Sequence, residues 1–201
     1  MENRKFILEI LQQIFGFLSL KPKVLPKNIS NPVVVTKSEP QPEVQKIVEE
    51  KPPVMQPKWH PPIREDKFRA TQKFLNPDPI YKITGHHPGT DYGTQGEDNV
   101  PLHFCADGEI VESGSHKAFG NYFFYYVPVV DRTFVYFHLR DAAPSRGLYK
   151  AGQQCGITGE TGMSAGIHIH LECMNGRKTS TDRACLYTSK EALAEAAEDA
   201  D

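Results

Sequence analysis

The 201-residue sequence lacks a strong charge of either sign, and its formal net charge at pH 7 is −2. No stripe of lysine and arginine accompanies the aromatic residues, which excludes a strongly basic nucleic-acid-binding protein, so we expect no nucleic-acid partner. The composition also excludes a collagen-like chain and a wholly disordered one. The length favours one folded domain of ordinary size over two large ones.

The first 58 residues lack histidine and cysteine altogether. They contain 1 of the 15 glycines and 3 of the 20 aromatic residues, but 8 of the 16 prolines. All 8 histidines lie between His60 and His170. This change in composition predicts a domain boundary near residue 59. The expected segments are an N-terminal helix, a Pro-rich linker, the folded domain and an acidic C-terminal helix or tail, at residues 1–20, 21–58, 59–187 and 188–201.

Residues 6–20 form an apolar run that is too short for a membrane-spanning helix. Apolar residues at helical spacing predict a lopsided amphipathic helix, at Ile7, Leu11, Ile14 and Leu18. Its length of roughly 22 Å falls short of a ~30 Å hydrocarbon core, and Glu9 would lie inside that core. Two basic residues precede the run as in a signal peptide, but no small-x-small cleavage site follows. Four interpretations stay open: a membrane-surface anchor, a self-associating or partner-docking helix, an atypical export signal, and packing on the main domain.

Residues 21–58 contain 8 prolines but no glycine and no aromatic residue. Such a segment buries too little apolar surface to offset the entropy of ordering it, so we predict a disordered tether. At about 3.1 Å per residue, it reaches on the order of 100 Å when extended. At the other end of the chain, Thr188 and Glu191 form a capping-box pattern, which predicts a short acidic helix or tail over residues 188–201.

Residues 59–187 lack helical stretches that alternate with strands, which excludes a doubly wound parallel sheet. They contain short runs rich in aromatic and β-branched residues, separated by Gly, Pro, Asn or Asp. The predicted strands are residues 102–106, 109–113, 122–130, 133–139 and 167–173. We therefore predict a mainly β fold, an antiparallel β-sheet domain with long loops.

The last predicted strand carries two histidines in alternation with apolar residues. Its odd-numbered residues from 167 to 173 are all apolar and define one face. His168, His170 and Glu172 therefore share the opposite face. Two imidazoles that point into one space suit joint action on one ion or one reacting group.

The strand 133–139 carries a single histidine near its end. Strict alternation predicts that His138 shares a face with Phe134 and Tyr136, and that Leu139 lies on the other face.

His87 and Asp91 form a His-x₃-Asp pair. Pro88 and Gly89 between them make a helix implausible and predict a loop that enters a strand. There the imidazole and the carboxylate can converge on one cation, and two histidines plus a carboxylate with one open position is a catalytic zinc pattern. The spacing alone is a weak signal. Together with the downstream His-x-His pair and the glycine-rich run at residues 156–166, it becomes specific.

These motifs resemble, in order and spacing, those of the lysostaphin/LytM-type zinc metalloendopeptidases, which cleave the peptide stems or cross-bridges of bacterial peptidoglycan. The matching motifs are His-x₃-Asp, Tyr-x-His-Leu and a glycine-rich run ending in His-x-His, at residues 87–91, 136–139 and 156–170. The resemblance covers roughly residues 65–175. Residues 68–81 also resemble the entry segment of phage-borne members.

The resemblance implies roles for five residues. His87, Asp91 and His170 would be the ligands of one zinc ion, and His138 and His168 would be the catalytic histidines. Bound zinc polarises an amide carbonyl and acidifies water. One of the two histidines would act as general base and the other would stabilise the oxyanion or protonate the leaving amine, and the assignment between them stays open. The glycines before His168 would let the backbone run close to an extended peptide substrate.

Other candidate residues belong to no motif. A tyrosine assists in some family members at the position of Tyr81, but a structural role is favoured here. Glu172 either forms a hydrogen bond to a metal ligand from behind or is a surface carboxylate. The remaining histidines are expected to be ordinary surface or core residues: His60, His86, His103 and His116. The cysteines lack Cys-x₂-Cys spacing, which excludes a Cys₄ zinc site and leaves any disulfide pairing open: Cys105, Cys155, Cys173 and Cys185. Of these, Cys105 and Cys173 are expected to be buried as small hydrophobic residues.

The expected function is zinc-dependent hydrolysis of peptide bonds in peptidoglycan, for lysis or remodelling of the cell wall. Its setting would be the cell envelope, the extracellular space or a phage particle. The alternative is a catalytically inactive LytM-like domain that binds the wall or activates another hydrolase. The presence of all five motif residues favours the enzyme. Residues 6–20 would provide contact with a membrane surface or with a second copy of the chain.

Overall fold

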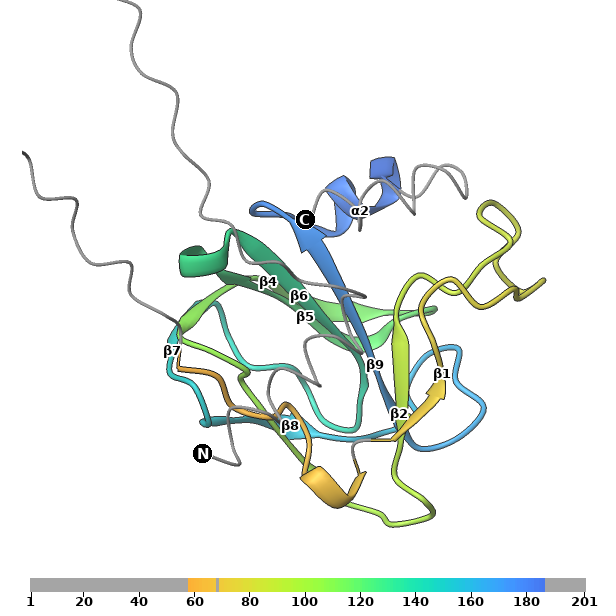
Figure 1. Ribbon diagram of the computed structural model, residues 1–201, viewed down its shortest axis with the longest axis horizontal. Helices are drawn as coiled ribbons and strands as arrows, with labels where there is room; N and C mark the ends of the chain where they lie inside the picture. The colour runs from red at the N-terminus through yellow and green to blue at the C-terminus, as the bar shows by residue number, and fades with distance from the viewer. Residues whose placement is uncertain (1–57, 68, 187–201) are drawn as a thin grey trace, which may run out of the picture.

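The computed structural model describes residues 58–67 and 69–186. The N-terminal helix, nearly all of the Pro-rich linker and the acidic tail that the sequence predicts lie outside these residues. Within them the chain folds into a curved, mainly antiparallel β-sheet domain with one short α-helix (Figure 1). This confirms the predicted fold class. Among the described residues, no helix has the length and apolar character to cross a bilayer.

Seven strands form the main sheet. They are β1 (Ala70–Gln72), β2 (Thr90–Gly93), β4 (Gly108–His116), β5 (Gly120–Val127), β6 (Arg132–Leu139), β7 (Gly147–Tyr149) and β9 (His168–Asn175). Their order in space is β1-β2-β9-β6-β5-β4-β7, and all neighbours are antiparallel. A second sheet pairs β3 (Pro101–His103) with β8 (Gln154–Ile157).

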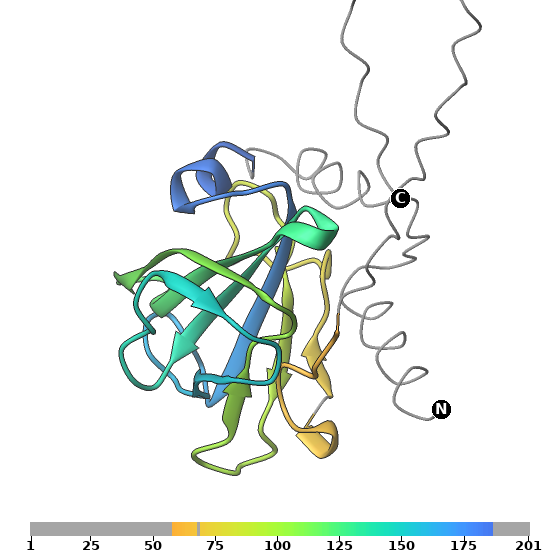
Figure 2. The same cartoon turned by 90° about the vertical axis from the view of Figure 1, so that its left-hand side faces the viewer.

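Short helical segments complete the described elements. They are the 3₁₀ helices η1 (Glu65–Lys67) and η2 (Pro128–Val130), and the α-helix α2 (Ser180–Leu186). Figure 2 shows α2 at one end of the sheet, while the connection between β2 and β3 extends beyond the other end. At the start of helix α2, the Thr179 backbone N–H and hydroxyl both donate to Asp182 Oδ2, at 2.8 and 2.7 Å, which caps this end of the helix.

Each of the five predicted strands overlaps an observed one. The predicted strand 122–130 ends early because Pro128 cannot donate to a ladder and begins η2 instead. Strand β2 is the one that the loop after His87 is predicted to enter, but the sequence sets no bounds for it, and β1, β7 and β8 are not predicted. They contain 3 or 4 residues each, too few to show an alternation in the sequence.

The larger core fills the space between the main sheet and the small sheet β3–β8. Phe104, which follows β3, packs against Phe123 and Tyr125 of the main sheet, with ring centroids 5.7 and 4.5 Å apart. Buried aromatic and aliphatic side chains of this size contribute about 1.5–3 kcal/mol each. This core therefore provides most of the stabilisation that holds the sheet in shape.

The described cysteines line the same core as free thiols. Cys105 and Cys155 are buried and Cys173 is half-buried against them. This confirms the expectation that Cys105 and Cys173 lie in the core. Burial raises the pKa of the Cys105 thiol to about 12, so it stays protonated and unreactive at neutral pH.

A smaller apolar cluster lies on the opposite face of the main sheet. It consists of buried residues from four strands: Val111, Phe124, Val135, Phe137 and Met174. The Phe119 ring stacks on Phe137 with a centroid separation of 4.4 Å and an interplanar angle of 4°. The candidate functional residues lie beside this cluster, on the same face.

The alternation predicted for β9 is confirmed. Ile169 and Leu171 belong to the larger core, while His170 and Glu172 lie on the opposite face. In β6 the same alternation holds only as far as Phe137, which belongs to the smaller cluster.

The predicted face of His138 is wrong, because β6 contains a bulge at this residue. Asn121 pairs with Leu139 and Phe123 with Tyr136, so two residues of β6 oppose one residue of β5. His138 has a left-handed backbone, with φ of 63°. The extra residue reverses the alternation: Leu139 joins Tyr136 in the larger core, and His138 turns towards the histidines of β9.

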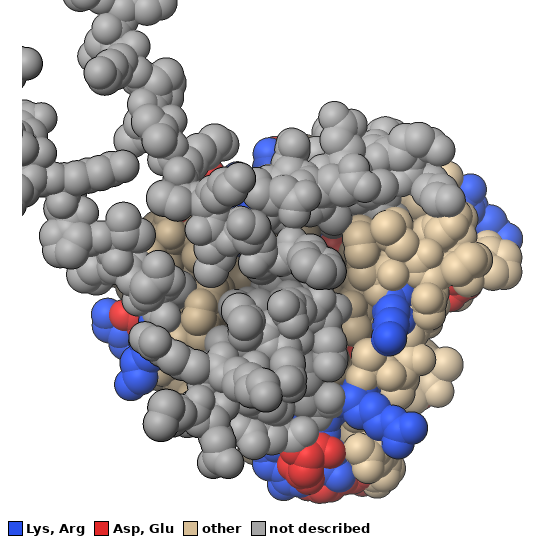
Figure 3. All heavy atoms as spheres, in the orientation of Figure 1, with Lys and Arg blue, Asp and Glu red and all other residues tan. Residues whose placement is uncertain are grey.

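Acidic and basic side chains lie together at the lower edge of the molecule in Figure 3. Among the charged residues, Arg64 and Lys67 each form an ion pair of 2.9 Å with Glu97, which links η1 to the β2–β3 connection. Because these pairs are exposed to solvent, each contributes little to stability.

Candidate functional site

Three neighbouring strands bring the predicted site residues together. Strand β2 pairs with β9 so that Asp91 lies opposite His170. Strand β6 pairs with the other edge of β9 so that Phe137 lies opposite the same histidine. The bulge then directs His138, the residue after Phe137, to the same side.

The loop before β2 places His87 next to this pair. The His87 backbone is held on both sides, because its N–H donates to the Asn76 carbonyl and its own carbonyl accepts from the Leu75 N–H, each at 2.9 Å. A Cβ atom at Gly89 would collide with the Leu171 carbonyl oxygen and with the His170 ring. Only glycine therefore lets the loop approach β9 closely enough to bring His87 into the site. The predicted loop that enters a strand is confirmed.

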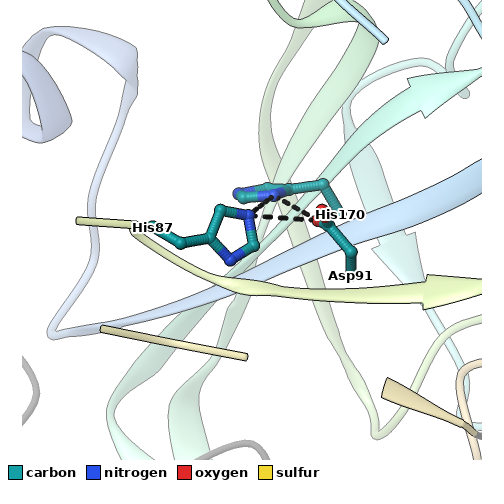
Figure 4. A group of neighbouring side chains, drawn as sticks. All are labelled: His87, Asp91 and His170. Atoms are coloured by element: carbon teal, nitrogen blue, oxygen red, sulfur yellow. Dashed lines mark hydrogen bonds and ion pairs between the residues drawn. The ribbon is translucent and has the colours of Figure 1, made fainter. Parts of the chain in front are cut away.

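His87, Asp91 and His170 offer three ligand atoms on one small patch (Figure 4). His170 Nδ1 lies 2.7 Å from Asp91 Oδ1 and 3.1 Å from His87 Nε2. His87 Nε2 lies 3.2 Å from the same Asp91 oxygen. Tetrahedral zinc with bonds of roughly 2.0–2.1 Å holds its ligand atoms about 3.3 Å apart. The three atoms thus lie close to the spacing of a zinc site, and two imidazoles with one carboxylate suit that ion.

Each of the two imidazoles in this group is oriented through its other nitrogen. His87 Nδ1 lies 3.2 Å from the Lys73 carbonyl oxygen, and His170 Nε2 lies 2.8 Å from Glu172 Oε1. A carbonyl can only accept a hydrogen bond, so His87 Nδ1 carries the hydrogen and Nε2 keeps its lone pair for a ligand bond. The carboxylate of Glu172 favours the corresponding arrangement in His170.

Glu172 is a buried partner of His170 and not a surface carboxylate. The residue is 1% exposed, and Arg183 of α2 donates to both of its carboxylate oxygens. Burial opposes ionisation of Glu172, but the Arg183 charge and the hydrogen bond from His170 outweigh it and lower its pKa to about 2.

The charges around His170 hold a proton in the absence of a cation. Burial alone would lower its pKa, but hydrogen bonds to Asp91 and Glu172 raise it to about 9. Burial also opposes ionisation of Asp91, yet its hydrogen bonds to His170 and His87 lower the pKa of the carboxyl well below the usual value. A metal ion can replace this proton as the positive charge at the site.

His138 and His168 form a second pair beside the three ligand atoms, with ring centroids 4.8 Å apart. His138 Nδ1 donates to the Thr161 carbonyl at 2.7 Å, and His168 Nδ1 donates to the Gly166 carbonyl at 2.8 Å. Their Nε2 atoms are therefore the proton-accepting atoms in the neutral form. His168 Nε2 lies 3.8 Å from Asp91 Oδ1, which places this ring at the edge of the ligand group.

Burial lowers the pKa of His138 to about 4, although the hydrogen bond to Thr161 acts in the opposite direction. The ring is therefore neutral at pH 7. A histidine in this form can accept a proton but has none to give from Nε2.

The glycine-rich run supports His138 from behind. A Cβ at Gly159 would collide with the Arg140 backbone, and one at Gly162 would collide with the Gly120 backbone. The Thr161 hydroxyl donates to the Leu139 carbonyl at 2.7 Å. These two glycines thus let the run pack against β5 and β6 and present the Thr161 carbonyl to His138. This structural role differs from the close approach to a peptide substrate that the sequence predicts for the glycines.

The remaining candidates lie around or away from this site. The Tyr81 ring packs on His87 with a centroid separation of 5.5 Å, and burial raises the pKa of its hydroxyl well above the usual value. His60 packs on His103, His86 bonds to the Thr84 carbonyl, and His116 packs on Phe119. Thr161 lies in the glycine-rich run of the motif, but the sequence predicts no role for it, because its contact to His138 is made by a backbone carbonyl. Arg183 is not predicted, because neither its type nor its spacing marks it in the sequence.

Comparison with known proteins gives relatives for this domain. No family model matches the chain. It is 31% identical over 115 residues to the peptidoglycan DD-endopeptidase ShyB of Vibrio cholerae serotype O1. The aligned region covers 53% of this chain and 25% of ShyB. It is 30% identical over 126 residues to ShyA, a peptidoglycan DD-endopeptidase of the same organism, covering 60% of this chain and 28% of ShyA. The chain thus matches only about a quarter of the length of these relatives.

The described fold is also similar to the crystal structure of a zinc-containing peptidase from Vibrio cholerae. The TM-score is 0.51 at 26% sequence identity, and the match covers 59% of this chain and 36% of that one. Together, the sequence relatives and this structure confirm the resemblance to the lysostaphin/LytM-type peptidases.

Proposed function

We propose that this relative of the lysostaphin/LytM-type peptidases is a zinc-dependent endopeptidase that hydrolyses peptide bonds in the stems or cross-bridges of peptidoglycan. The observation that carries the proposal is the meeting of His87, Asp91 and His170 beside two further histidines. The names of ShyB and ShyA, both peptidoglycan DD-endopeptidases, support the substrate class. The zinc-containing peptidase supports the choice of metal.

The ligand group would hold zinc through His87 Nε2, Asp91 Oδ1 and His170 Nδ1. When bound, zinc supplies a Lewis acid that polarises the scissile carbonyl and acidifies water. The protein contributes the orientation of the ligands, through the Lys73 carbonyl behind His87 and through Glu172 behind His170.

His138 is the proposed general base. Its ring is neutral at pH 7, and its Nδ1 hydrogen is held by Thr161, so Nε2 accepts the proton of the attacking water. His168 is held by Gly166 in the same way and lies between His138 and Asp91. In its protonated form, which carries hydrogens on both ring nitrogens, His168 is proposed to stabilise the negative charge that develops on the carbonyl oxygen, or to give the leaving amine its proton.

The proposed setting is the cell envelope, the extracellular space or a phage particle, where peptidoglycan is accessible. The segments 1–20 and 21–58 are proposed as an anchoring or self-associating helix and a tether that lets the domain reach the wall.

The decisive experiment is digestion of purified peptidoglycan by the full chain, followed by mass spectrometry of the released fragments. We expect peptide fragments from the wild type, none after removal of zinc by a chelator, and restored cleavage when zinc is added back. His170→Ala should be inactive. His60→Ala is the matched control, because His60 packs on His103 away from the site, and it should remain active.

Two outcomes would contradict the proposal. One is a purified chain that binds no zinc, and the other is undiminished cleavage by His170→Ala. Chelator-insensitive binding to the wall without cleavage would favour the non-catalytic alternative.

A further inference from the structure

Helix α2 lies after the segment that resembles the family, yet it contacts the predicted metal site. The contact runs through two charged side chains. Arg183 of α2 binds Glu172, and Glu172 binds His170, whose other ring nitrogen faces Asp91 and His87. A chain of three side chains thus connects the helix to a predicted ligand atom.

The link between Arg183 and Glu172 has the geometry of a strong, specific pair. Arg183 Nε donates to Oε2 at 2.7 Å and Nη2 donates to Oε1 at 2.5 Å, so both carboxylate oxygens are held by one planar group. The Glu172 side chain is fully buried and that of Arg183 is 14% exposed. A buried carboxylate of this kind needs a charged partner to stay in place.

The position of the Arg183 guanidinium is itself fixed. It lies over the rings of Phe119 and Phe137, 5.0 and 5.2 Å from their centroids. The Phe137 ring is in turn nearly parallel to the His170 ring, at 9° and 5.4 Å. The arginine and the predicted ligand therefore share one rigid neighbour as well as one carboxylate.

Helix α2 is anchored to the sheet next to this arginine. Thr179 donates two hydrogen bonds to the Asp182 carboxylate, and the Ser180 N–H donates to Glu112 Oε2 of β4 at 2.9 Å. The helix is thereby held in a place from which Arg183 reaches across to β9.

We propose that Arg183 is a positioning residue for the metal site, acting through Glu172 to fix the ring and the ligand nitrogen of His170. The inference rests on the proposed function, because it presumes that His170 is a ligand. Without Arg183, the Glu172 carboxylate would be drawn from its buried place towards water. Its hydrogen bond to His170 Nε2 would be lost, and the ring would no longer be held with Nδ1 towards Asp91.

The test measures zinc binding by the full chain, with a chromophoric chelator as competitor. Arg183→Met should weaken zinc binding about 10–100-fold, the range typical for loss of a partner behind a metal ligand. Glu172→Gln should weaken it to a similar extent. Arg183→Lys keeps the charge but not the bidentate contact, so its zinc affinity should lie between those of Arg183→Met and the wild type.

Arg177→Met is the matched control. Arg177 precedes α2 by a few residues and pairs with Glu109 at the surface, at 2.9 Å, without contact to Glu172. Its loss should change zinc affinity by less than about twofold, because exposed pairs contribute little.

A spectroscopic measurement separates positioning from mere stabilisation of the helix. With Co²⁺ in place of zinc, Arg183→Met and Glu172→Gln should shift the visible absorption bands, which depend on ligand geometry, while Arg177→Met should not. The double variant Arg183→Met/Glu172→Gln should lose no more affinity than the weaker-binding single variant, because both act along one path.

The outcomes are distinct for the two proposals. If the wild type binds no zinc, the proposed function fails. If the wild type binds zinc and Arg183→Met and Glu172→Gln bind it equally well with unchanged Co²⁺ spectra, the role of Arg183 is refuted and the proposed function stands. A lower unfolding temperature with unchanged affinity and spectra would likewise refute it, and if Arg183→Met does not fold, Glu172→Gln and Arg183→Lys decide.

Discussion

Where β2 and β9 pair, the two faces of the main sheet differ in the kind of side chain that they carry. On the face towards the small sheet, strands β2, β6 and β9 contribute Tyr92, Tyr136 and Ile169, all buried in an apolar core. On the opposite face, β2 and β9 contribute Asp91 and His170 to the predicted metal site. Adjacent residues of one strand therefore have different roles, one in the apolar core and one in the predicted metal site. The comparison teaches that stability and chemistry in this domain can be damaged separately, by changes one residue apart.

The largest expected effect is the loss of function in His170→Ala. Zinc affinity should fall by more than the roughly 100-fold that loss of a partner behind a ligand costs, because a ligand itself is removed. Peptidoglycan cleavage should disappear. The fold, measured by circular dichroism, should remain, because the larger core is unchanged. An unfolded His170→Ala protein would show that the two faces are not separable.

Next in size is the effect of His138→Ala on the rate of cleavage. The turnover number should fall about 10²–10⁴-fold, the usual contribution of a general base. Zinc affinity should stay within a few-fold of the wild type, because His138 is not among the three predicted ligands. Kinetics on a defined muropeptide, together with chelator competition, check both parts. A loss of zinc in this variant would instead make His138 a ligand.

Ile169→Ala should have the opposite effect, a loss of stability with function retained. This residue is fully buried in the larger core, so its truncation should lower the free energy of unfolding by about 2–5 kcal/mol. Urea unfolding measures this loss. Cleavage per folded molecule and zinc stoichiometry should match the wild type, and a loss of activity greater than about tenfold in folded protein would contradict the separation of the faces.

The smallest expected effect is a dependence of stability on pH in chelator-treated protein. The pKa of His170 rises from 6.5 to about 9 on folding, so its contribution is fully present below pH 6.5 and is lost as the pH rises through 9. The unfolding temperature should fall by some degrees over this range. Zinc affinity should rise over the same range, because the ion must displace the proton. Chelator-treated His170→Ala should lack this part of the pH dependence.

The sequence alone predicts the apolar faces well, because alternation in a strand follows directly from the pleat. His168, His170 and Ile169 were assigned to their faces on this basis, and the structure agrees. His138 was assigned to the wrong face because a bulge adds one residue to β6, and the bulge depends on how β6 pairs with β5. The register between two strands depends on residues far apart in the chain, so no short sequence pattern predicts it.

The predicted ligand group came from motif spacing and the family resemblance, and the structure brings its three members within ligand distance of one another. The support behind the group was harder to foresee. The Thr161 carbonyl and the Arg183 guanidinium act across the fold, on partners that spacing does not reveal. Helix α2 is not predicted, although Thr179 and Asp182 pair at its start, because no apolar periodic run follows them.

The pairing of β2 with β9 also bears on how the domain withstands proteolytic nicking. Asp91 and His170 are 79 residues apart in the chain, yet they meet through adjacent strands, the second and third from one edge of the main sheet. The segment between β6 and β7 is a surface connection that leads to the exposed Leu148. A cut in that connection would separate the two halves of the sequence without separating these two strands. Molecules cut there would stay assembled through the pairing of β2 with β9. A cation bound by Asp91 and His170 would add a second link between the two fragments, which a chelator would remove.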